Sequence, residues 1–458
     1  MSEENKVMFD DTQLEAVALC VDINKRLVAI SGPAGSGKTT LIQQAYEELI
    51  KAGKRVALAA PTGKAARRIK EATGINASTL HKLLEYSRPG ERDEKTGEAV
   101  EVSEPKRNRA NPLEIDIVFV DEYAMVNHEL HNNLLAALPK GGCVRAFGDL
   151  AQLPPIEPYQ VTKNTGQPEP TPFNKIITKY DGVQLDKVYR QGEGSGILIE
   201  ANKIRQRKMP TMNQDLGDFQ VTLTDKPVQQ LTEFVINSLD NGVNFGHIEH
   251  QIIVPSKKTW VGTAKLNSTL RQLLNPTPDA LLQLPREKWI KDDCIIGLHD
   301  KVVCTSNTYD MRNYFERYEQ FDDAMNPIYH TFIPCPENMQ MLNGETGIVI
   351  AIHPDDSIEV DFGYRVVHIP YTYEEYWAQK KTIINAQPLK GIDLAYALTT
   401  HKCQGSEFQS ICYVLNKSTQ FTQSNQNLYT AVTRARKRVD VISDQISIRV
   451  SIMKMKVV

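Results

Sequence analysis

The sequence predicts an α/β protein with two parallel-sheet domains and two insertions. Three observations lead to this fold class. Short apolar runs alternate with amphipathic helical segments over residues 25–149, which is typical of a parallel sheet covered by helices on both faces. The glycine-rich segment 32–39 joins one of these runs to one of these helical segments. The alternation restarts from about residue 200, and a strand-rich stretch interrupts it.

The size and charge of the chain limit the class of protein. The chain has 458 residues, and at about 150 residues per domain roughly three domains are expected. Hydrophobic residues make up 41% and charged residues 24% of the chain, which is typical of a globular protein. The net charge of −3 excludes a uniformly basic coat protein for nucleic acid, but a local basic groove would still bind nucleic acid.

Cysteine usage and the absence of a long apolar run indicate the compartment. The 7 cysteines include no Cys-x-x-Cys pair, which argues against a disulfide framework and a zinc ribbon and favours a reducing cytosol. The acidic, polar start differs from a signal or transit peptide, and no apolar run approaches the roughly 20 residues that span a bilayer. We expect a soluble, cytoplasmic protein without a membrane partner, in a bacterial or phage-host cytosol.

Each expected element of the first domain, residues 1–199, has a local signal. Short apolar runs predict buried strands at 25–30, 55–60, 115–120 and 143–149. Amphipathic segments predict helices at 39–54, 64–74 and 128–138. His128 and His131 lie at the start of the third helix. No further metal ligand has a suitable spacing, so we interpret this pair as part of a solvated helix face.

A charged stretch at residues 87–112 interrupts the first domain. Of its 26 residues 12 are charged, and Val100 and Val102 are its only sizeable aliphatic side chains, so it has too little apolar surface to form a core. We expect a solvated loop or a charged hairpin, with the whole insertion at about 84–112. A turn-like Lys95-Thr96-Gly97 favours the hairpin.

The second domain, residues 200–275 and 391–458, repeats the alternation. Its signals predict strands at 250–256, 410–416 and 440–443 and helices at 259–274 and 427–439. The intervening residues 276–390 change character, with short strands expected at 301–306, 345–353, 357–362 and 366–371. Short strands separated by turns predict a small β-barrel inserted into this domain.

The segment Gly32–Thr39, GPAGSGKT, fits the pattern of a phosphate-binding loop between a strand and a helix. Its glycines let backbone N–H groups surround phosphate oxygens, and the helix N-terminus adds partial positive charge. Lys38 is placed to contact the β- and γ-phosphates, and the Thr39 hydroxyl is placed to bind Mg²⁺. A simple glycine-rich turn is the alternative interpretation. The predicted nucleotide-binding residues of this segment are Gly32, Pro33, Ala34, Gly35, Ser36, Gly37, Lys38, Thr39 and Thr40.

An acidic pair, Asp121 and Glu122, ends the predicted strand 115–120. Asp121 would bind Mg²⁺ together with Thr39, and Glu122 would polarise an attacking water. The pair favours hydrolysis of a nucleotide over simple phosphate binding. A surface Asp-Glu at a strand end is the alternative interpretation.

Further segments occur in a fixed order along almost the whole chain. They are DDTQLEAV (10–17), APTGKAARRI (60–69), ASTLHKLL (77–84), FVDEYAMV (119–126), GDLAQLPPI (148–156), LDKVYRQ (185–191), LAYALTTHKCQGSEF (394–408) and LYTAVTRARKRV (428–439). In this order they resemble the superfamily 1B DNA helicases of the RecD-like and phage Dda-like group. The resemblance implies two RecA-like P-loop NTPase motor domains, with a small charged hairpin insertion and a Src-homology-3-like β-barrel insertion at 276–390.

The resemblance also implies roles for single residues around the nucleotide. Gln13 is similar to the glutamine that recognises adenine, and Gln152 to the residue that senses the γ-phosphate or the attacking water. Arg190 and Arg434 resemble the two arginine fingers, which stabilise transition-state charge only when the domains close. Glu407 resembles an acidic contact to the nucleotide sugar. A polar residue on a helix face and a surface arginine are the alternatives for Gln13 and Arg434.

The same resemblance places a DNA site at the strand ends of both domains. Residues 51–70 contain seven basic residues and no acidic residue, a local excess that suits contacts to phosphates. A solvated helix face is the alternative for these basic side chains, and a structural role is the alternative for the two histidines of the site. The residues that resemble DNA contacts are Pro61, Thr62, Gly63, Thr79, His81, Thr400, His401 and Lys402.

The resemblance implies an ATP- and Mg²⁺-dependent helicase that moves 5′ to 3′ on single-stranded DNA and separates duplex. Its expected partners are single-stranded DNA and single-strand/duplex junctions, with single-strand-binding, replication, recombination or repair proteins as candidates, and we expect a monomer. The stretch 87–112 occupies the place of the family's strand-separating hairpin but contains no Phe or Trp. The alternative is therefore a single-strand-stimulated ATPase or translocase that remodels nucleoprotein, or acts on RNA, with little unwinding.

Overall fold

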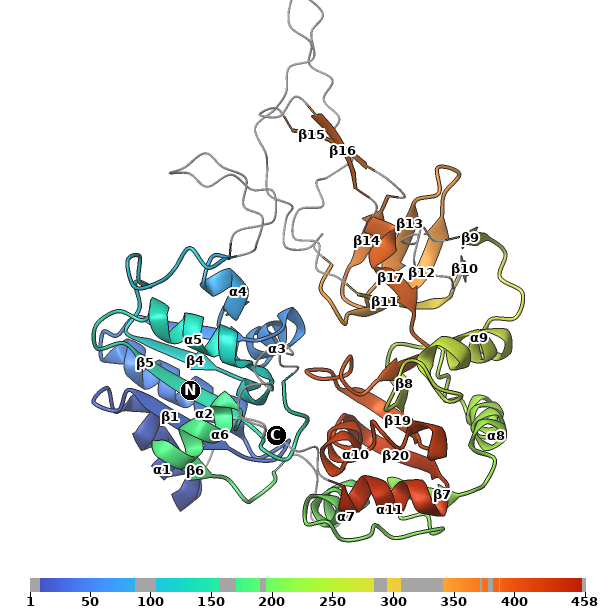
Figure 1. The fold of residues 1–458 in the computed structure, drawn as a ribbon, viewed down its shortest axis with the longest axis horizontal. Coiled ribbons are helices and arrows are strands. Elements are labelled where there is room, and N and C mark those ends of the chain that lie inside the picture. Colours follow the sequence, from blue (N-terminus) through green and yellow to red (C-terminus); the bar gives the residue numbers. More distant parts are fainter. Residues whose placement is uncertain are drawn as a thin grey trace, which may run out of the picture.

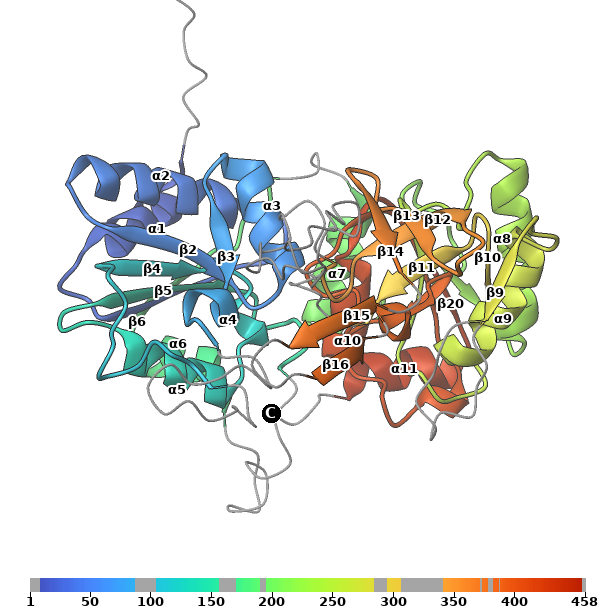
Figure 2. The same cartoon turned by 90° about the horizontal axis from the view of Figure 1, so that it is seen from above.

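The structure is a computed structural model of this chain. It describes residues 9–86, 104–155, 170–189, 195–283, 295–305, 341–370, 373–377, 382–386 and 388–454. Two units, each built on a parallel sheet, lie side by side, and an antiparallel sheet lies next to the second unit (Figures 1 and 2). The predicted α/β class is confirmed in this two-domain form.

The first unit contains a six-stranded sheet in the order β3-β2-β4-β5-β1-β6, with every neighbouring pair parallel. The strands predicted at 25–30, 55–60, 115–120 and 143–149 correspond to β1, β2, β4 and β5. The sequence alone does not predict the edge strands β3 and β6, because a strand of three or four residues is too short to show a periodic pattern of apolar residues. The strand bounds are β1 Leu27–Ser31, β2 Val56–Ala60, β3 Ala77–Thr79, β4 Ile117–Val120, β5 Cys143–Gly148 and β6 Asp181–Gln184.

Helices cover both faces of this sheet (Figure 1). Successive strand side chains point to opposite faces, so Val28 and Ile30 pack with α1, α2 and α3, whereas Leu27 and Ala29 pack with α4, α5 and α6. The expected helices are confirmed within a few residues. The bounds are α1 Asp11–Val21, α2 Lys38–Lys51, α3 Gly63–Thr73, α4 Leu80–Leu83, α5 His128–Ala137 and α6 Pro172–Lys179, with the 3-10 helix η1 Tyr123–Met125 after β4.

The second unit contains a five-stranded parallel sheet in the order β18-β8-β19-β20-β7. Helices α7, α10 and α11 pack on one face and α8 and α9 on the other. The strand bounds are β7 Phe219–Leu223, β8 His250–Val254, β18 Ala397–Thr399, β19 Phe408–Val414 and β20 Ala435–Ser443. The helix bounds are α7 Gly196–Arg205, α8 Pro227–Asp240, α9 Thr263–Leu274, α10 Asn425–Val432 and α11 Gln445–Met453, with η4 Lys417–Thr419.

The helix predicted at 427–439 is wrong beyond Val432. Helix α10 ends there, and residues from Ala435 on form β20, which pairs in parallel with β19. The first half of β20 carries the exposed residues Arg436 and Lys437, so it has no buried-strand signal. The pairing partner that makes it a strand lies far away in the sequence.

The strand-rich stretch forms an antiparallel sheet in the order β14-β13-β12-β11-β17. Its bounds are β11 Lys301–Cys304, β12 Thr346–Ile352, β13 Ile358–Asp361, β14 Val366–Ile369 and β17 Ile392–Leu394, with η3 Pro388–Gly391 before the last strand. Gly344 has a φ of +88° in the turn before β12, a conformation that favours glycine. Two further strand pairs are β9 Leu281–Gln283 with β10 Ile295–Gly297, and β15 Tyr373–Trp377 with β16 Thr382–Ala386.

The charged insertion leaves the first unit next to α4. Tyr86 and Pro105 form an isolated antiparallel bridge, and Arg107 N donates a hydrogen bond to Leu84 O at 3.1 Å. The two ends of the insertion therefore lie together, whereas residues 87–103, which carry the predicted hairpin, are outside the described residues. Among the described helices, none has the length and apolar character needed to cross a membrane.

Candidate nucleotide site between the two parallel-sheet units

The glycine-rich loop connects β1 to α2, as the sequence predicts. Gly35 and Gly37 have φ values of +82° and +85°, and Gly37 is the N-cap of α2. The Lys38 ammonium donates hydrogen bonds to the carbonyls of Gly32 and Pro33 at 2.8 and 2.9 Å. These bonds hold the cationic side chain against the loop, next to the N-terminus of α2 where phosphate groups are stabilised.

Gln13 reaches this loop from α1. Its side-chain amide donates to the Ser36 carbonyl at 3.3 Å, and only 5% of the residue is exposed. A Cβ atom added to Gly37 would lie 2.8 Å from Gln13 Nε2, so the glycine makes room for this contact. The structure thus brings the predicted adenine-recognising residue to the edge of the phosphate-binding loop.

The acidic pair lies at the carboxyl end of β4, two strands from β1 in the sheet. Glu122 N donates to Asp121 Oδ1 at 2.8 Å, and Glu122 has a left-handed φ of +52°. Burial raises the pKa of Asp121, the negative charge of Glu122 raises it further, and Lys38 opposes both. A bound cation would relieve this repulsion, and the Asp121 carboxylate and Thr39 hydroxyl are the oxygen ligands that Mg²⁺ prefers.

A cavity of about 500 Å³ unites these residues with residues of the second unit. This volume is in the range of small-molecule sites. Three residues of the loop, Gly32, Pro33 and Ser36, do not line the cavity, and neither does Gln13, which contacts the loop. Arg190 lies outside the described residues. The predicted residues that line the cavity are Ala34, Gly35, Gly37, Lys38, Thr39, Thr40, Asp121, Glu122 and Gln152 from the first unit, and Glu407 and Arg434 from the second.

Charged side chains of the second unit are held firmly at this cavity. Arg434 is 2% exposed, and its guanidinium donates to the carbonyls of Thr430 and Ser406 at 3.1 and 3.4 Å. Glu407 Oε2 lies 2.9 Å from Arg436 Nε. The Glu407 carboxylate also forms an ion pair with Arg68 of α3. The second pair crosses between the two units, so Glu407 is engaged by arginines of both.

Sequence reasoning missed several residues that line this cavity, among them the polar side chains of Arg68, Glu71 and Tyr189. The Tyr189 hydroxyl donates to Asp10 Oδ2 at 2.5 Å, and its backbone N–H donates to Gly35 O at 2.8 Å. Its place next to Arg190 in LDKVYRQ was the available signal. The basic run 51–70 included Arg68, but only its contact with Glu407 distinguishes it from the other basic residues.

The loop that carries Gln152 is bonded to the second unit. Leu153 N donates to Thr430 Oγ1 at 2.8 Å, and Gln404 Nε2 donates to Leu153 O at 3.1 Å. The Tyr429 hydroxyl donates to Asp149 Oδ2 at 2.8 Å. This loop therefore connects the nucleotide cavity to α10 and to the turn after β18.

The segments predicted to contact DNA meet near this turn. Pro61, Thr62 and Gly63 join β2 to α3, and the Thr62 hydroxyl accepts a hydrogen bond from Ala65 N at 3.2 Å. A Cβ atom added to Gly405 would lie 3.3 Å from Thr62 Oγ1. The strand-end segments of the two units are thus adjacent, as a site shared by both units requires.

Two of the predicted DNA contacts are corrected by their burial. Thr400 is 0% exposed and its hydroxyl donates to Asn427 Oδ1, so its side chain supports the turn and has no surface for a ligand. Thr79 is 7% exposed and its hydroxyl caps α4 by accepting from Lys82 N. His81 is exposed and lies against the Tyr86 ring at 4.8 Å, while His401 and Lys402 are partly exposed.

Comparisons with known proteins agree with this geometry. A family profile described as an AAA domain matches residues 13–158, and one described as a UvrD-like helicase C-terminal domain matches residues 394–442. Two solved structures with 20% identity share the fold. One is entitled "Structural Basis for DNA Unwinding at Forked dsDNA by two coordinating Pif1 helicases"; its TM-score is 0.57, and the match covers 98% of this chain and 94% of that chain. The other is a Pif1 helicase from Bacteroides in complex with ADP-AlF3 and ssDNA; its TM-score is 0.56, and the match covers 98% of this chain and 95% of that chain.

Curated relatives match along nearly the whole chain. The ATP-dependent RecD2 DNA helicase of Deinococcus radiodurans is 29% identical over 414 residues, which is 90% of this chain and 46% of that protein. The RecBCD enzyme subunit RecD of Mycolicibacterium smegmatis is 25% identical over 97% of this chain and 73% of that protein. This chain thus spans about half the length of the first relative. These matches, together with the motif order, make the chain similar to the RecD-like helicases of superfamily 1B.

Proposed function

We propose that this protein is an ATP-dependent DNA helicase that translocates 5′ to 3′ on single-stranded DNA and separates duplex. The observation that carries the proposal is the shared cavity, because its lining combines Lys38, Asp121 and Glu122 of one unit with Arg434 of the other. A site divided between two units makes hydrolysis depend on their closure. The polarity rests on the family resemblance.

Each side chain has a role in hydrolysis. Lys38 binds β- and γ-phosphate oxygens, and Glu122 orients the attacking water. Arg434 and Arg190 stabilise the charge that develops on the transferred phosphoryl group. Thr39 and Asp121 would hold Mg²⁺, which when bound neutralises phosphate charge.

The loop at Gln152 couples this chemistry to the DNA. Its contacts with Thr430 and Gln404 join the cavity to the turn that carries His401 and Lys402. A change at the γ-phosphate would therefore shift the strand-end segments that grip the DNA backbone. Alternating grip by the two units converts hydrolysis into directed steps.

The related proteins support a DNA substrate. The relatives include a protein named as a DNA helicase, and the structural neighbours include helicases with ssDNA or forked duplex. We propose single-stranded DNA and junctions as the substrates, a monomeric motor, and a Src-homology-3-like insertion formed by the antiparallel sheet. Single-strand-binding, replication or recombination proteins are proposed partners.

The experiment that tests the proposal is steady-state ATP hydrolysis with and without single-stranded DNA, with Glu122→Gln as control. We expect strong stimulation by DNA that disappears in the variant. Hydrolysis that is indifferent to DNA would overturn the helicase assignment. Duplexes with a 5′ or a 3′ single-stranded tail then test polarity, since only the 5′-tailed substrate should be unwound.

The charged insertion favours a second candidate, a translocase or nucleoprotein-remodelling ATPase that unwinds little. Residues 87–112 contain no Phe or Trp that would stack on an opened base pair. A strand-separation assay beside a translocation assay distinguishes the candidates: comparable rates in both remove the second. Stimulation by RNA oligomers equal to that by DNA would show an RNA substrate.

A further inference from the structure

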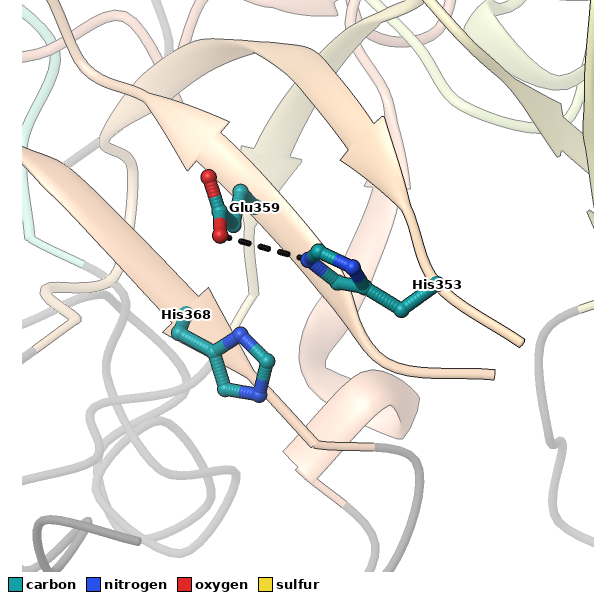
Figure 3. A group of neighbouring side chains, drawn as sticks. All are labelled: His353, Glu359 and His368. Atoms are coloured by element: carbon teal, nitrogen blue, oxygen red, sulfur yellow. Dashed lines mark hydrogen bonds and ion pairs between the residues drawn. The ribbon is translucent and has the colours of Figure 1, made fainter. Parts of the chain in front are cut away.

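Three side chains that commonly bind metals gather on the antiparallel sheet, outside the nucleotide cavity. They are His353, Glu359 and His368, each partly buried, with ligand atoms that all lie within 4.8 Å of one another. His353 Nε2 and Glu359 Oε1 are 3.2 Å apart. Figure 3 shows the His353 ring and the Glu359 carboxylate facing each other, with the His368 ring beside them on the same side of the strands.

The strand pairing fixes the backbone of all three residues. Glu359 on β13 is the register partner of His368 on β14, and directly opposed residues of antiparallel strands share one face. Their neighbours Val360 and Val367 are buried in the core of the sheet, so Glu359 and His368 point away from that core. The cluster is therefore built into the pairing of β13 with β14.

His353 joins the cluster through the turn after β12. Its backbone N–H donates to Ser357 O at 2.9 Å, and Asp356 N donates to His353 O at 3.0 Å. Asp356 has a left-handed φ of +62°, which is typical of the last residue of a three-residue hairpin loop. This short loop holds His353 beside β13.

The electrostatics of the cluster suit a cation. The His353 and His368 ring centroids are 5.5 Å apart. Glu359 and Asp355 act on His368 as negative charges, and Asp355 is held by hydrogen bonds from the Ser357 N–H and hydroxyl at 3.1 and 2.6 Å.

We propose that His353, Glu359 and His368 bind a Zn²⁺ ion. Two imidazoles and one carboxylate are a typical zinc donor set, whereas Ca²⁺ and Mg²⁺ prefer oxygen ligands alone. Tetrahedral zinc with bonds of about 2.0–2.1 Å holds its ligand atoms about 3.3 Å apart. The His353–Glu359 pair already has this spacing, so only His368 must move closer by a side-chain rotation.

Zinc bound here would join β12, β13 and β14 and leave one coordination position for water or a partner group. The proposal concerns the antiparallel sheet alone and is independent of ATP hydrolysis. Because the ion binds the folded sheet, zinc should raise the melting temperature of the protein.

The test is the zinc content of purified protein after incubation with ZnSO4 and dialysis, measured by mass spectrometry of the metal. We expect about one Zn²⁺ per chain, lost in the double variant His353→Gln, His368→Gln and weakened in Glu359→Gln. The control is His299→Asn, since His299 is an exposed histidine with a φ of +68° that asparagine tolerates. Equal zinc in wild type and double variant, or none in the wild type, would overturn the proposal.

A second measurement needs no substitution and keeps the test decisive if the double variant fails to fold. Diethyl pyrocarbonate modifies accessible histidines, and peptide mass spectrometry locates them. Zinc should protect His353 and His368 from modification and leave His299 unchanged. Modification of the first two at the same rate with and without ZnSO4 would contradict the site.

Discussion

Glu122 adopts a left-handed backbone conformation directly after β4, with a φ of +52°. For a residue other than glycine this conformation costs about 1–3 kcal/mol and is concentrated at functional sites. Its backbone N–H donates to the Asp121 carboxylate, and both side chains line the cavity. The strained backbone thus places two carboxylates with different proposed tasks side by side.

Replacing Glu122 by Gln should keep nucleotide binding and abolish most hydrolysis. The amide preserves the shape of the side chain but accepts no proton from the attacking water, a contribution of typically 10²–10⁴-fold. Turnover of ATP and binding of a fluorescent nucleotide are measured in parallel. Glu129→Gln, an exposed position on α5, is the matched control and should hydrolyse normally. Normal turnover in Glu122→Gln would reject the assigned role.

Arg434→Ala should bind nucleotide but lose most of its DNA-stimulated hydrolysis. An arginine that neutralises transition-state charge contributes about 10³–10⁵-fold in comparable enzymes, and Arg434 is held at the cavity by two carbonyls. Single-turnover hydrolysis measures the effect. Arg449→Ala, an exposed position on α11, is the control. Near-normal turnover in Arg434→Ala would remove the arginine-finger assignment.

The pair His128 and His131 is only partly a solvated helix face, which corrects the sequence interpretation. His131 Nδ1 lies 2.8 Å from the Tyr123 hydroxyl. Desolvation lowers the pKa of His131 from 6.5 to about 4, and His128 and Lys175 contribute in the same direction. The partly buried, neutral ring is therefore a structural part of the first unit.

This histidine predicts a pH dependence of stability. Because the folded pKa is the lower one, the unfolded chain binds the extra proton between pH 6.5 and 4, so stability falls as the pH falls through this window. The loss is at most about 3 kcal/mol. We expect His131→Gln to be less stable at pH 7 and to lose less stability on acidification than wild type, as measured by urea unfolding. Parallel pH profiles would contradict this prediction.

Lys301 connects the antiparallel sheet to the second unit. The residue is 0% exposed, and its ammonium donates to the carbonyls of His247 and His250 at 2.9 and 2.6 Å. These carbonyls belong to the segment that enters β8. A single side chain thus fixes the start of β11 against the parallel sheet.

Lys301→Met should loosen this element locally. The substitution keeps the aliphatic stem but leaves buried carbonyls without a donor, which costs about 2 kcal/mol or more. That cost corresponds to about thirtyfold faster hydrogen exchange of the β11 and β12 amides. Lys437→Met, at an exposed position of β20, should leave exchange unchanged. Unaltered protection of the β11 amides from hydrogen exchange in Lys301→Met would show that the Lys301 hydrogen bonds are not needed to hold β11 in place.

The two units are joined across the molecule by polar contacts as well as by the cavity. Leu153 N donates to Thr430 Oγ1, and Gln404 Nε2 donates to Leu153 O. The Arg68–Glu407 ion pair adds a second connection. These contacts connect residues at the cavity in the first unit directly to the second unit.

Thr430→Val should uncouple hydrolysis from DNA. The valine has nearly the same shape but accepts no hydrogen bond, so the buried Leu153 N–H loses its partner at a cost of about 1–3 kcal/mol. We expect DNA stimulation of ATP hydrolysis to fall by about tenfold or more, with DNA-independent hydrolysis retained. Thr178→Val, on the exposed face of α6, is the control. Full stimulation in Thr430→Val would reject this coupling route.

Local sequence signals were sufficient to predict those structural elements and site residues that are defined within a single short segment. The buried strands β1, β2 and β4, the loop 32–39 and the acidic pair after β4 have such signals, because a buried strand and a phosphate loop are defined within about ten residues. Short edge strands such as β3 have no local sequence signal of this kind, and neither does the strand conformation of Ala435–Val439. Their structure depends on a neighbouring strand that is distant in the sequence.

The sequence by itself determined the two parallel sheets, the nucleotide loop and the family resemblance, since these follow from residue order and period. Only the tertiary structure decided which residues share a surface. It buried Thr400, joined Arg68 to Glu407, and gathered His353, Glu359 and His368 from one turn and two strands. The physical reason is that burial, ion pairing and metal ligation depend on distances in space, and strand pairing sets these distances between residues with no periodic relation along the chain.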